Sequence, residues 1–152
     1  MGMRRSLARR GDRGQAQVEF VLSIFFVLLT IFGIFELTMF IYTYSVLSDA
    51  AKEGVRYAVV HGSSNTSPSG PGSTSAIDGA AGTGVVKTYA QYSLHDTTQM
   101  TVTVSYPDTT NPPANQAPNR VQVQVSYVYQ PFLGFGWPSA TVYANAEGRI
   151  IY

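Results

Sequence analysis

The sequence predicts an α+β protein: a long N-terminal helix, then a small domain with a short helix and a three- to four-stranded antiparallel sheet. Three observations carry this prediction. A largely apolar stretch runs from Phe20 to Ser48, apolar residues at helical spacing follow it, and two later segments alternate with period two. The 152 residues leave room for one small domain plus an anchor.

Composition divides the chain into four zones. Residues 1–14 form a basic leader, and residues 15–61 a long helix with a transmembrane span at about 20–42. Residues 62–84 form a loop rich in Ser, Gly and Pro. Residues 85–152 form a small exported α+β domain.

Charge is concentrated at the N-terminus. The first 14 residues hold five arginines and one aspartate, although the whole chain carries a net charge of only +1. Arginines beside a spanning segment stay on the cytoplasmic side, so we expect a cytoplasmic N-terminus and an exported C-terminal domain. The mildly acidic remainder argues against a nucleic-acid partner. The sequence has no cysteine, which excludes disulfides and Cys-based metal sites.

The apolar stretch is long enough to cross a bilayer. Phe20 to Phe35 contains no charged residue, and the helix from Phe20 to Ser48 would extend roughly 43 Å. A hydrocarbon core of about 30 Å needs only about 20 residues. No clear small-x-small cleavage site follows, so we expect a retained span and not a removed signal peptide.

Beyond the span the helix becomes amphipathic. Two i,i+3 pairs of opposite charge, Asp49–Lys52 and Glu53–Arg56, lie largely opposite an apolar face that includes Leu47 and Ala58. A patch of small residues occupies the same region: Ala50, Ala51 and Gly54. Such a patch allows close helix packing, either against the chain's own sheet or between subunits of an assembly.

The C-terminal zone reads as one short helix and three strands. Val85 to Leu94 has helical spacing, while Met100 to Tyr106 and Val121 to Tyr129 alternate cleanly. Ser139 to Ile150 is predicted as a third strand. The proline-rich connection 107–119 should be exposed. Such a small sheet needs one covered face, and the amphipathic part of the long helix can supply it.

Two glutamates lie in the apolar helix: Glu19 at its N-terminal edge, and Glu36 further along within it. Their separation of 17 residues corresponds to roughly 26 Å, so they would bracket the hydrocarbon. For Glu36 two interpretations stay open: a contact between subunits, or a carboxylate at the outer headgroup level. A cut between Gly14 and Gln15 would create an α-amino group four residues before Glu19, able to pair with its carboxylate.

These residues carry a family resemblance. The segment "GQAQVEF", Gly14 to Phe20, resembles the processing site of type IV pilin-like proteins. Together with the G-x-x-E-L pattern at Gly33–Leu37 and A-A-x-E-G-x-R-Y-A at Ala50–Ala58, it resembles the TadE-like family, pseudopilins of the tight-adherence (Tad/Flp) pilus system. One departure is that Thr38 and Met39 stand where many members have Gly-Arg.

The resemblance implies roles for specific residues. The processing site would consist of Gly14, Gln15, Glu19 and Phe20. Helix assembly would involve the following residues: Glu19, Gly33, Glu36, Ala50, Ala51 and Gly54.

The implied function is that of a pseudopilin or minor pilin in the bacterial inner membrane, cut after Gly14 by a prepilin peptidase. Its partners would be other pilins or pseudopilins and the Tad assembly platform. One alternative is an uncleaved single-pass envelope protein whose exported domain binds a partner or ligand. Another is the main subunit of an extracellular filament. We expect no enzymatic activity, cofactor or small-molecule substrate. We also expect no metal site, since His61 and His95 lack a ligand cluster.

Overall fold

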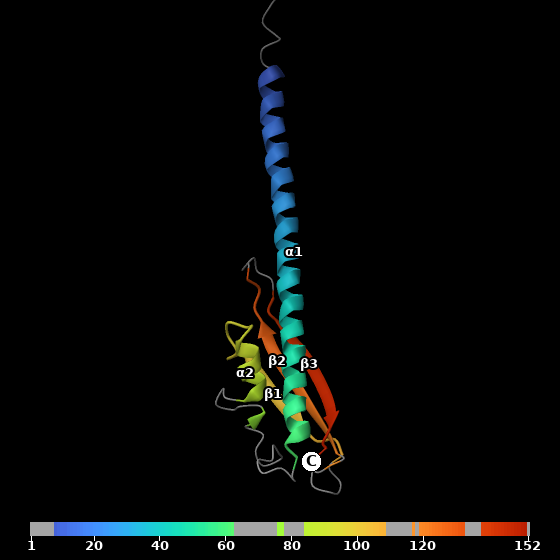
Figure 1. Cartoon of the computed structure of the whole chain (residues 1–152). Helices are drawn as coiled ribbons and strands as arrows, with labels where there is room; N and C mark the ends of the chain where they lie inside the picture. Colours follow the sequence, from blue (N-terminus) through green and yellow to red (C-terminus); the bar gives the residue numbers. More distant parts are fainter. Residues whose placement is uncertain are drawn as a thin grey trace, which may run out of the picture. The chain divides into compact units, whose positions relative to one another are not determined.

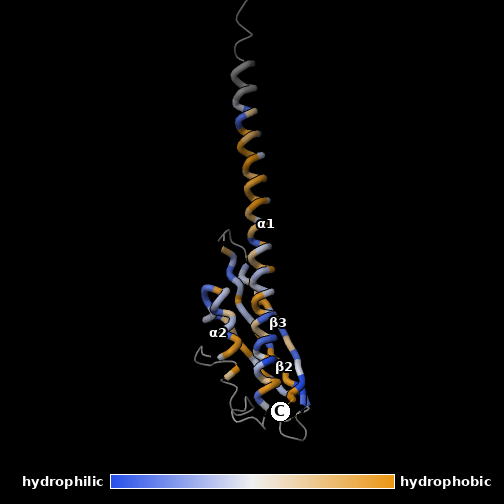
Figure 2. The backbone as a smooth tube through the Cα atoms, viewed as in Figure 1, coloured by the Kyte–Doolittle hydropathy of each residue, from blue (hydrophilic) through white to orange (hydrophobic). Residues whose placement is uncertain are grey.

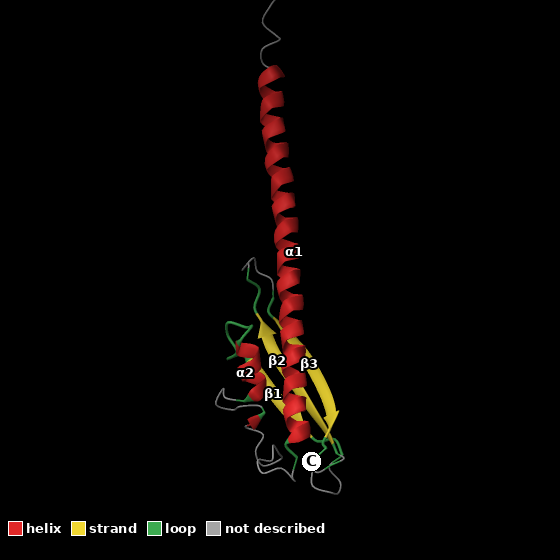
Figure 3. Cartoon of the chain, in the orientation of Figure 1, coloured by secondary structure: helices red, strands yellow, loops and turns green. Residues whose placement is uncertain are grey.

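The computed structural model describes residues 8–62, 76–77, 84–108, 117, 119–132 and 138–151. Figure 1 and Figure 3 show its elements, which run in the order α1 (Ala8–Val60), α2 (Val85–Gln91), β1 (Met100–Ser105), β2 (Arg120–Tyr129) and β3 (Ala140–Arg149). The three strands form one antiparallel sheet. The predicted α+β class is confirmed.

The chain forms two compact units, Met1–Met39 and Phe40–Tyr152. In its described part the first unit is the N-terminal portion of α1. The second unit holds the rest of α1, together with α2 and the sheet. Helix α1 spans Ala8–Val60, so it includes residues of the predicted leader.

The sheet has the order β1-β2-β3, with β2 in the centre. Met100 of β1 pairs with Tyr127 of β2, and Tyr129 at the end of β2 pairs with Ala140 of β3. The alternating sequence of β2 sends one set of side chains inward, where Val121, Val123 and Val125 are fully buried. The period-two pattern thus sets which face of the sheet packs.

The C-terminal part of α1 and the short helix α2 cover this inner face. Leu47, Ala50, Ala51 and Ala58 of α1 are completely buried, as are two residues of α2, Val86 and Ala90. These side chains belong to one hydrophobic cluster with the inward-facing valines of β2. The amphipathic face predicted for the helix is therefore the face that packs on the sheet.

Two glycines allow α1 to approach its neighbours closely. A Cβ atom at Gly54 would lie 2.6 Å from Cγ2 of Val86 and 3.3 Å from Cγ1 of Val123. A Cβ atom at Gly148 of β3 would lie 2.5 Å from Cγ1 of Val55. A side chain at either position would therefore require these valine side chains, or the elements that carry them, to shift.

The outer face of α1 carries the two predicted ion pairs. Lys52 Nζ lies 3.0 Å from Asp49 Oδ1, and Arg56 Nη1 lies 3.7 Å from Glu53 Oε2. Both pairs are largely exposed, so each contributes on the order of a few tenths of a kcal/mol.

Helix α1 ends at Val60. The ring of His61 stacks on Tyr57 at 3.9 Å between centroids. The N–H of Ile151, just past β3, donates to the carbonyl of Val59 at 3.1 Å. These contacts join the end of the helix to the end of the last strand.

Most of the two predicted loops, 62–84 and 107–119, lies outside the described residues. One described residue of the first range, Ile77, is fully buried. Its carbonyl accepts a hydrogen bond from Val86 N at 3.2 Å, and its side chain lies beside Gly54. Ile77 thus adds a core contact that the loop composition did not reveal.

The close approach at Gly54 yields a stability prediction. Gly54→Ala should destabilise the domain by about 1–3 kcal/mol, because the added methyl group collides with Val86. Thermal unfolding of the detergent-solubilised full chain, followed by near-UV circular dichroism, measures this. Gly33→Ala is the matched control, since nothing lies within 4 Å of its Cβ position. Equal melting temperatures for the two variants would contradict the packing described at Gly54.

Candidate functional site: the apolar surface of α1 and the end of the domain

The surface of α1 from Gly14 to Met39 is the first candidate site. In this range every described side chain is exposed except those at half-buried Gly33 and buried Glu36. The helix is long and apolar enough to cross a membrane, and Figure 2 shows its hydrophobic stretch in orange. A helix that is apolar all round needs lipid or other protein around it.

Two threonines within the apolar stretch are satisfied by the helix itself. Thr30 Oγ1 donates to the carbonyl of Phe26 at 2.9 Å, and Thr38 Oγ1 donates to the carbonyl of Ile34 at 2.9 Å. Both hydroxyls therefore have a hydrogen-bond partner that they would keep in hydrocarbon. These two threonines are thus compatible with a lipid environment.

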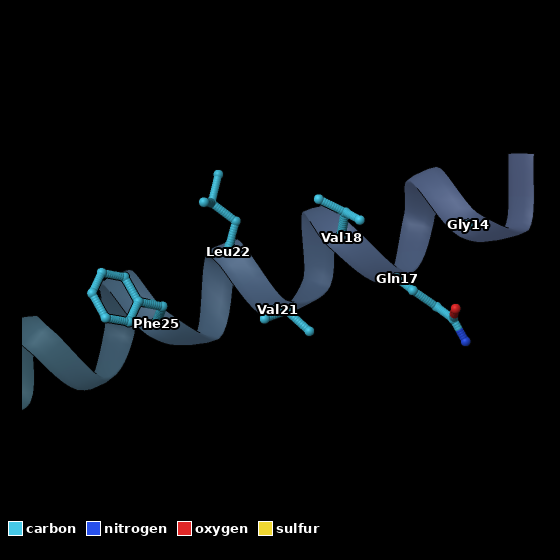
Figure 4. Close-up of a pocket in the computed structure, with 6 residues that line it drawn as sticks. All are labelled: Gly14, Gln17, Val18, Val21, Leu22 and Phe25. Atoms are coloured by element: carbon cyan, nitrogen blue, oxygen red, sulfur yellow. The ribbon is translucent and has the colours of Figure 1, made fainter.

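The four residues assigned to processing lie near the start of this surface. Gly14, Gln15, Glu19 and Phe20 are all on α1, and all are exposed. A shallow hollow follows the same turns, and Figure 4 shows its lining: Gly14, Gln17, Val18, Val21, Leu22 and Phe25. The Gly14–Gln15 bond thus lies inside a helix, with an apolar surface immediately after it.

The two glutamates have different surroundings. Glu19 is exposed, whereas Glu36 is only 5% exposed. At helical spacing Glu36 shares a face of α1 with Thr43 and Leu47, both of which are also buried. Glu36 is therefore a buried carboxylate within the single chain, a feature that the sequence alone did not reveal.

The small-residue patch lies inside the domain. Ala50 and Ala51 are fully buried, and Gly54 faces Val86, Ile77 and Val123. These three residues pack against α2, the sheet and Ile77 of the same chain. Gly33 has open space around its Cβ position instead.

A second candidate site is a hollow at one end of the domain. We call it the polar hollow; its lining residues are Thr43, Asp96, Gln99, Tyr127, Val128, Tyr129 and Gln130. The backbone N–H of Thr98 donates to Asp96 Oδ1 at 2.8 Å, and this bond lowers the pKa of the Asp96 carboxyl. Burial, and secondarily the charge of Asp96, raises the pKa of Tyr127. The hollow therefore carries a carboxylate beside a protonated phenol.

A charged network stabilises the strands. Asp108 accepts hydrogen bonds from the backbone N and side chain of Arg120, with the shortest contact, from Nη2, at 3.0 Å. Arg120 Nη1 also donates to Glu147 Oε1 at 3.0 Å. The hydrogen bonds from Arg120 lower the pKa of Asp108. The network links the start of β2 to β3 and to the segment that follows β1, so its role is structural.

The described residues contain no group of three or more His, Asp or Glu side chains that could hold a metal ion. The fold and the exposed helix define a class of protein in which a candidate membrane anchor carries a small α+β domain.

Residues 14–56 match the family model described as TadE-like protein. The match covers the apolar surface of α1 and most of the part that packs on the sheet, and it ends before α2. A search of curated proteins and a search of solved structures each gave no significant match. The chain thus carries a TadE-like segment.

The charged network yields a pH prediction. The pKa of Asp108 is lowered from 3.8 by folding, so its contribution to stability is present above pH 3.8 and disappears as the pH falls through the folded value. Asp108→Asn should therefore lower the melting temperature at neutral pH, and the difference from wild type should vanish in acid. A series of thermal melts across pH tests this.

Asp49→Asn serves as control, because Asp49 makes one exposed contact within α1. Its effect at neutral pH should be smaller than that of Asp108→Asn. If the melting temperature of Asp108→Asn stays below that of wild type at acid pH, the shape of the Asp108 side chain, and not its charge, accounts for its contribution to stability.

Proposed function

We propose that this protein is a pseudopilin or minor pilin of a tight-adherence pilus system, held in the bacterial inner membrane by α1. The observation that carries the proposal is the TadE-like match over residues 14–56, which includes the exposed apolar surface of α1. The N-terminus would lie in the cytoplasm and the α+β domain outside. The role is structural rather than enzymatic.

Processing by a prepilin peptidase would hydrolyse the peptide bond between Gly14 and Gln15. That bond lies within α1, so a peptidase that binds an extended backbone must first open the helix locally. Glycine is less favourable than alanine in a helix by about 1 kcal/mol, and Gly11 and Gly14 both lie in this stretch. These glycines therefore favour local unwinding around the bond that would be cut.

The cut would create a cationic amino group on Gln15. Glu19 lies four residues further along the helix, where an opposite charge is favourable. At the edge of a bilayer neither charge is well solvated, so pairing them offsets much of the cost of burial. The pair can form within one chain, or between Glu19 of one subunit and the terminus of the next. The second arrangement would set the register of neighbouring helices.

The remaining assembly surface would be the apolar side of α1 before the domain. Gly33 leaves open space in which a second helix can approach closely. Ala50, Ala51 and Gly54 are occupied inside the domain. We therefore assign subunit contacts to the region around Glu19 and Gly33, and the small-residue patch to the fold of the single chain.

A substitution at Glu19 tests the assembly role. Glu19→Ala should still insert into the membrane, because its apolar stretch is unchanged, but it should co-purify poorly with pilus components. Affinity capture of the variant from native membranes, with quantification of the pilins recovered, measures this. Gln17→Ala is the matched control: Gln17 is polar, exposed and two residues away.

Unchanged recovery of pilins with Glu19→Ala would contradict the proposal that Glu19 sets the register of neighbouring helices. Equal loss with Gln17→Ala would assign the effect to the hollow around Gln17 and not to the carboxylate. Abundance of the chain in sheared surface material would favour the main-subunit alternative. Membrane insertion without any pilin partner would favour an uncleaved envelope protein.

A further inference from the structure

One end of the domain carries exposed aromatic side chains. Tyr42 and Tyr44 on α1 are about half exposed, and Phe132, just after β2, is 74% exposed. We call these three residues the aromatic rim. Exposed aromatic side chains also occur elsewhere in the domain, at Tyr92 (87%) and Tyr143 (58%).

The contacts around Phe40 place the end of β2 beside this part of α1. The ring of Phe40 meets the ring of Tyr129 edge to face, with 5.4 Å between centroids. Gln130 lines the polar hollow together with Thr43. Phe132 follows Gln130 by two residues, so it lies within roughly 7 Å of that point. The rim residues therefore belong to one end of the domain.

The same end coincides with the end of the apolar span. The sequence places the outer boundary of the span at about residue 42, between Phe40 and Thr43. Aromatic side chains are enriched at that depth, because a ring there contacts acyl chains while its polar edge meets the headgroups. Phe132 comes from a different element than α1, so it would supply a second point of contact.

From this arrangement we propose that the aromatic rim rests in the headgroup region of the bilayer that α1 spans, with Phe132 inserted. The inference depends on the membrane-anchor part of the proposed function, but not on processing or pilus assembly. Two attachment points, α1 and Phe132, would hold the domain against the membrane. One helix alone would leave it free to rotate on its anchor.

The charges near the aromatic rim indicate which interaction would hold the rim at the bilayer. The described residues that line the polar hollow include Asp96, whose pKa is lowered, and none of them is Lys or Arg. Attraction to anionic lipid therefore does not drive the contact. Burial of aromatic surface does, so the contact should be insensitive to salt and to lipid charge.

The opposite end of the domain offers a matched reference. Ile151 is 61% exposed, and its N–H bonds to Val59, near the C-terminal end of α1. A reporter there should face water. Phe132 and Ile151 are both exposed and apolar, so tryptophan is tolerated at either position without disturbing the core.

The experiment uses two single-tryptophan chains. Trp137 is the sole tryptophan in the sequence, so Trp137→Phe gives a background into which Phe132→Trp or Ile151→Trp is placed. Each full-length chain is reconstituted at one copy per nanodisc in phosphatidylcholine, with or without a headgroup nitroxide quencher. The fluorescence of Phe132→Trp is expected to be quenched several-fold more strongly than that of Ile151→Trp, and its emission is expected at shorter wavelength. Added salt or phosphatidylglycerol should leave both unchanged.

Equal quenching at the two positions, or none at Phe132→Trp, would overturn the inference while leaving the membrane anchor intact. Quenching that appears only with several copies per disc would assign the rim to contacts between chains. Strong dependence on salt or lipid charge would replace aromatic burial with electrostatics. Failure of the chain to enter nanodiscs at all would overturn both the inference and the anchor on which it rests.

Discussion

The packing of the C-terminal part of α1 on the sheet is the interaction on which the rest of the domain depends. Three strands with one uncovered face are marginal in water, and α2 is too short to cover them. Leu47, Ala51 and Ala58 supply the missing layer, and Gly54 lets it approach closely. The helix that is the candidate anchor is therefore also part of the hydrophobic core. A cut within residues 46–58 would remove part of this core as well as separate the domain from the rest of α1.

The N-terminal part of α1 meets a different constraint, since its apolar side chains have no core to enter. Three of its polar residues have partners or surroundings within the chain: Thr30 and Thr38 donate hydrogen bonds to the helix backbone, and Glu36 is buried. The carboxylate of Glu19, in contrast to that of Glu36, is exposed. A cationic amino group created by processing would pair with the Glu19 carboxylate and offset the cost of placing that charge at the edge of the hydrocarbon.

Local patterns predicted most of the fold. The alternation in β2 and the helical spacing before Val60 depend on neighbouring residues, and both elements form where the sequence placed them. Contacts between distant residues were missed, because no local pattern encodes them. They include the burial of Ile77, the link from Asp108 to Arg120, and the polar hollow. The depth of Glu36 was predicted from spacing along the helix, but its burial depends on tertiary structure.

The central claim is that the TadE-like segment makes this chain a processed pilin-like subunit. The most direct test is the N-terminal residue of the protein extracted from its native membranes, read by intact mass and terminal sequencing. A chain that begins at Gln15 is the predicted result, and it would show that the Gly14–Glu19 motif is used. A chain that retains the arginines before Gly14 would contradict the claim, and it would leave an uncleaved anchored envelope protein.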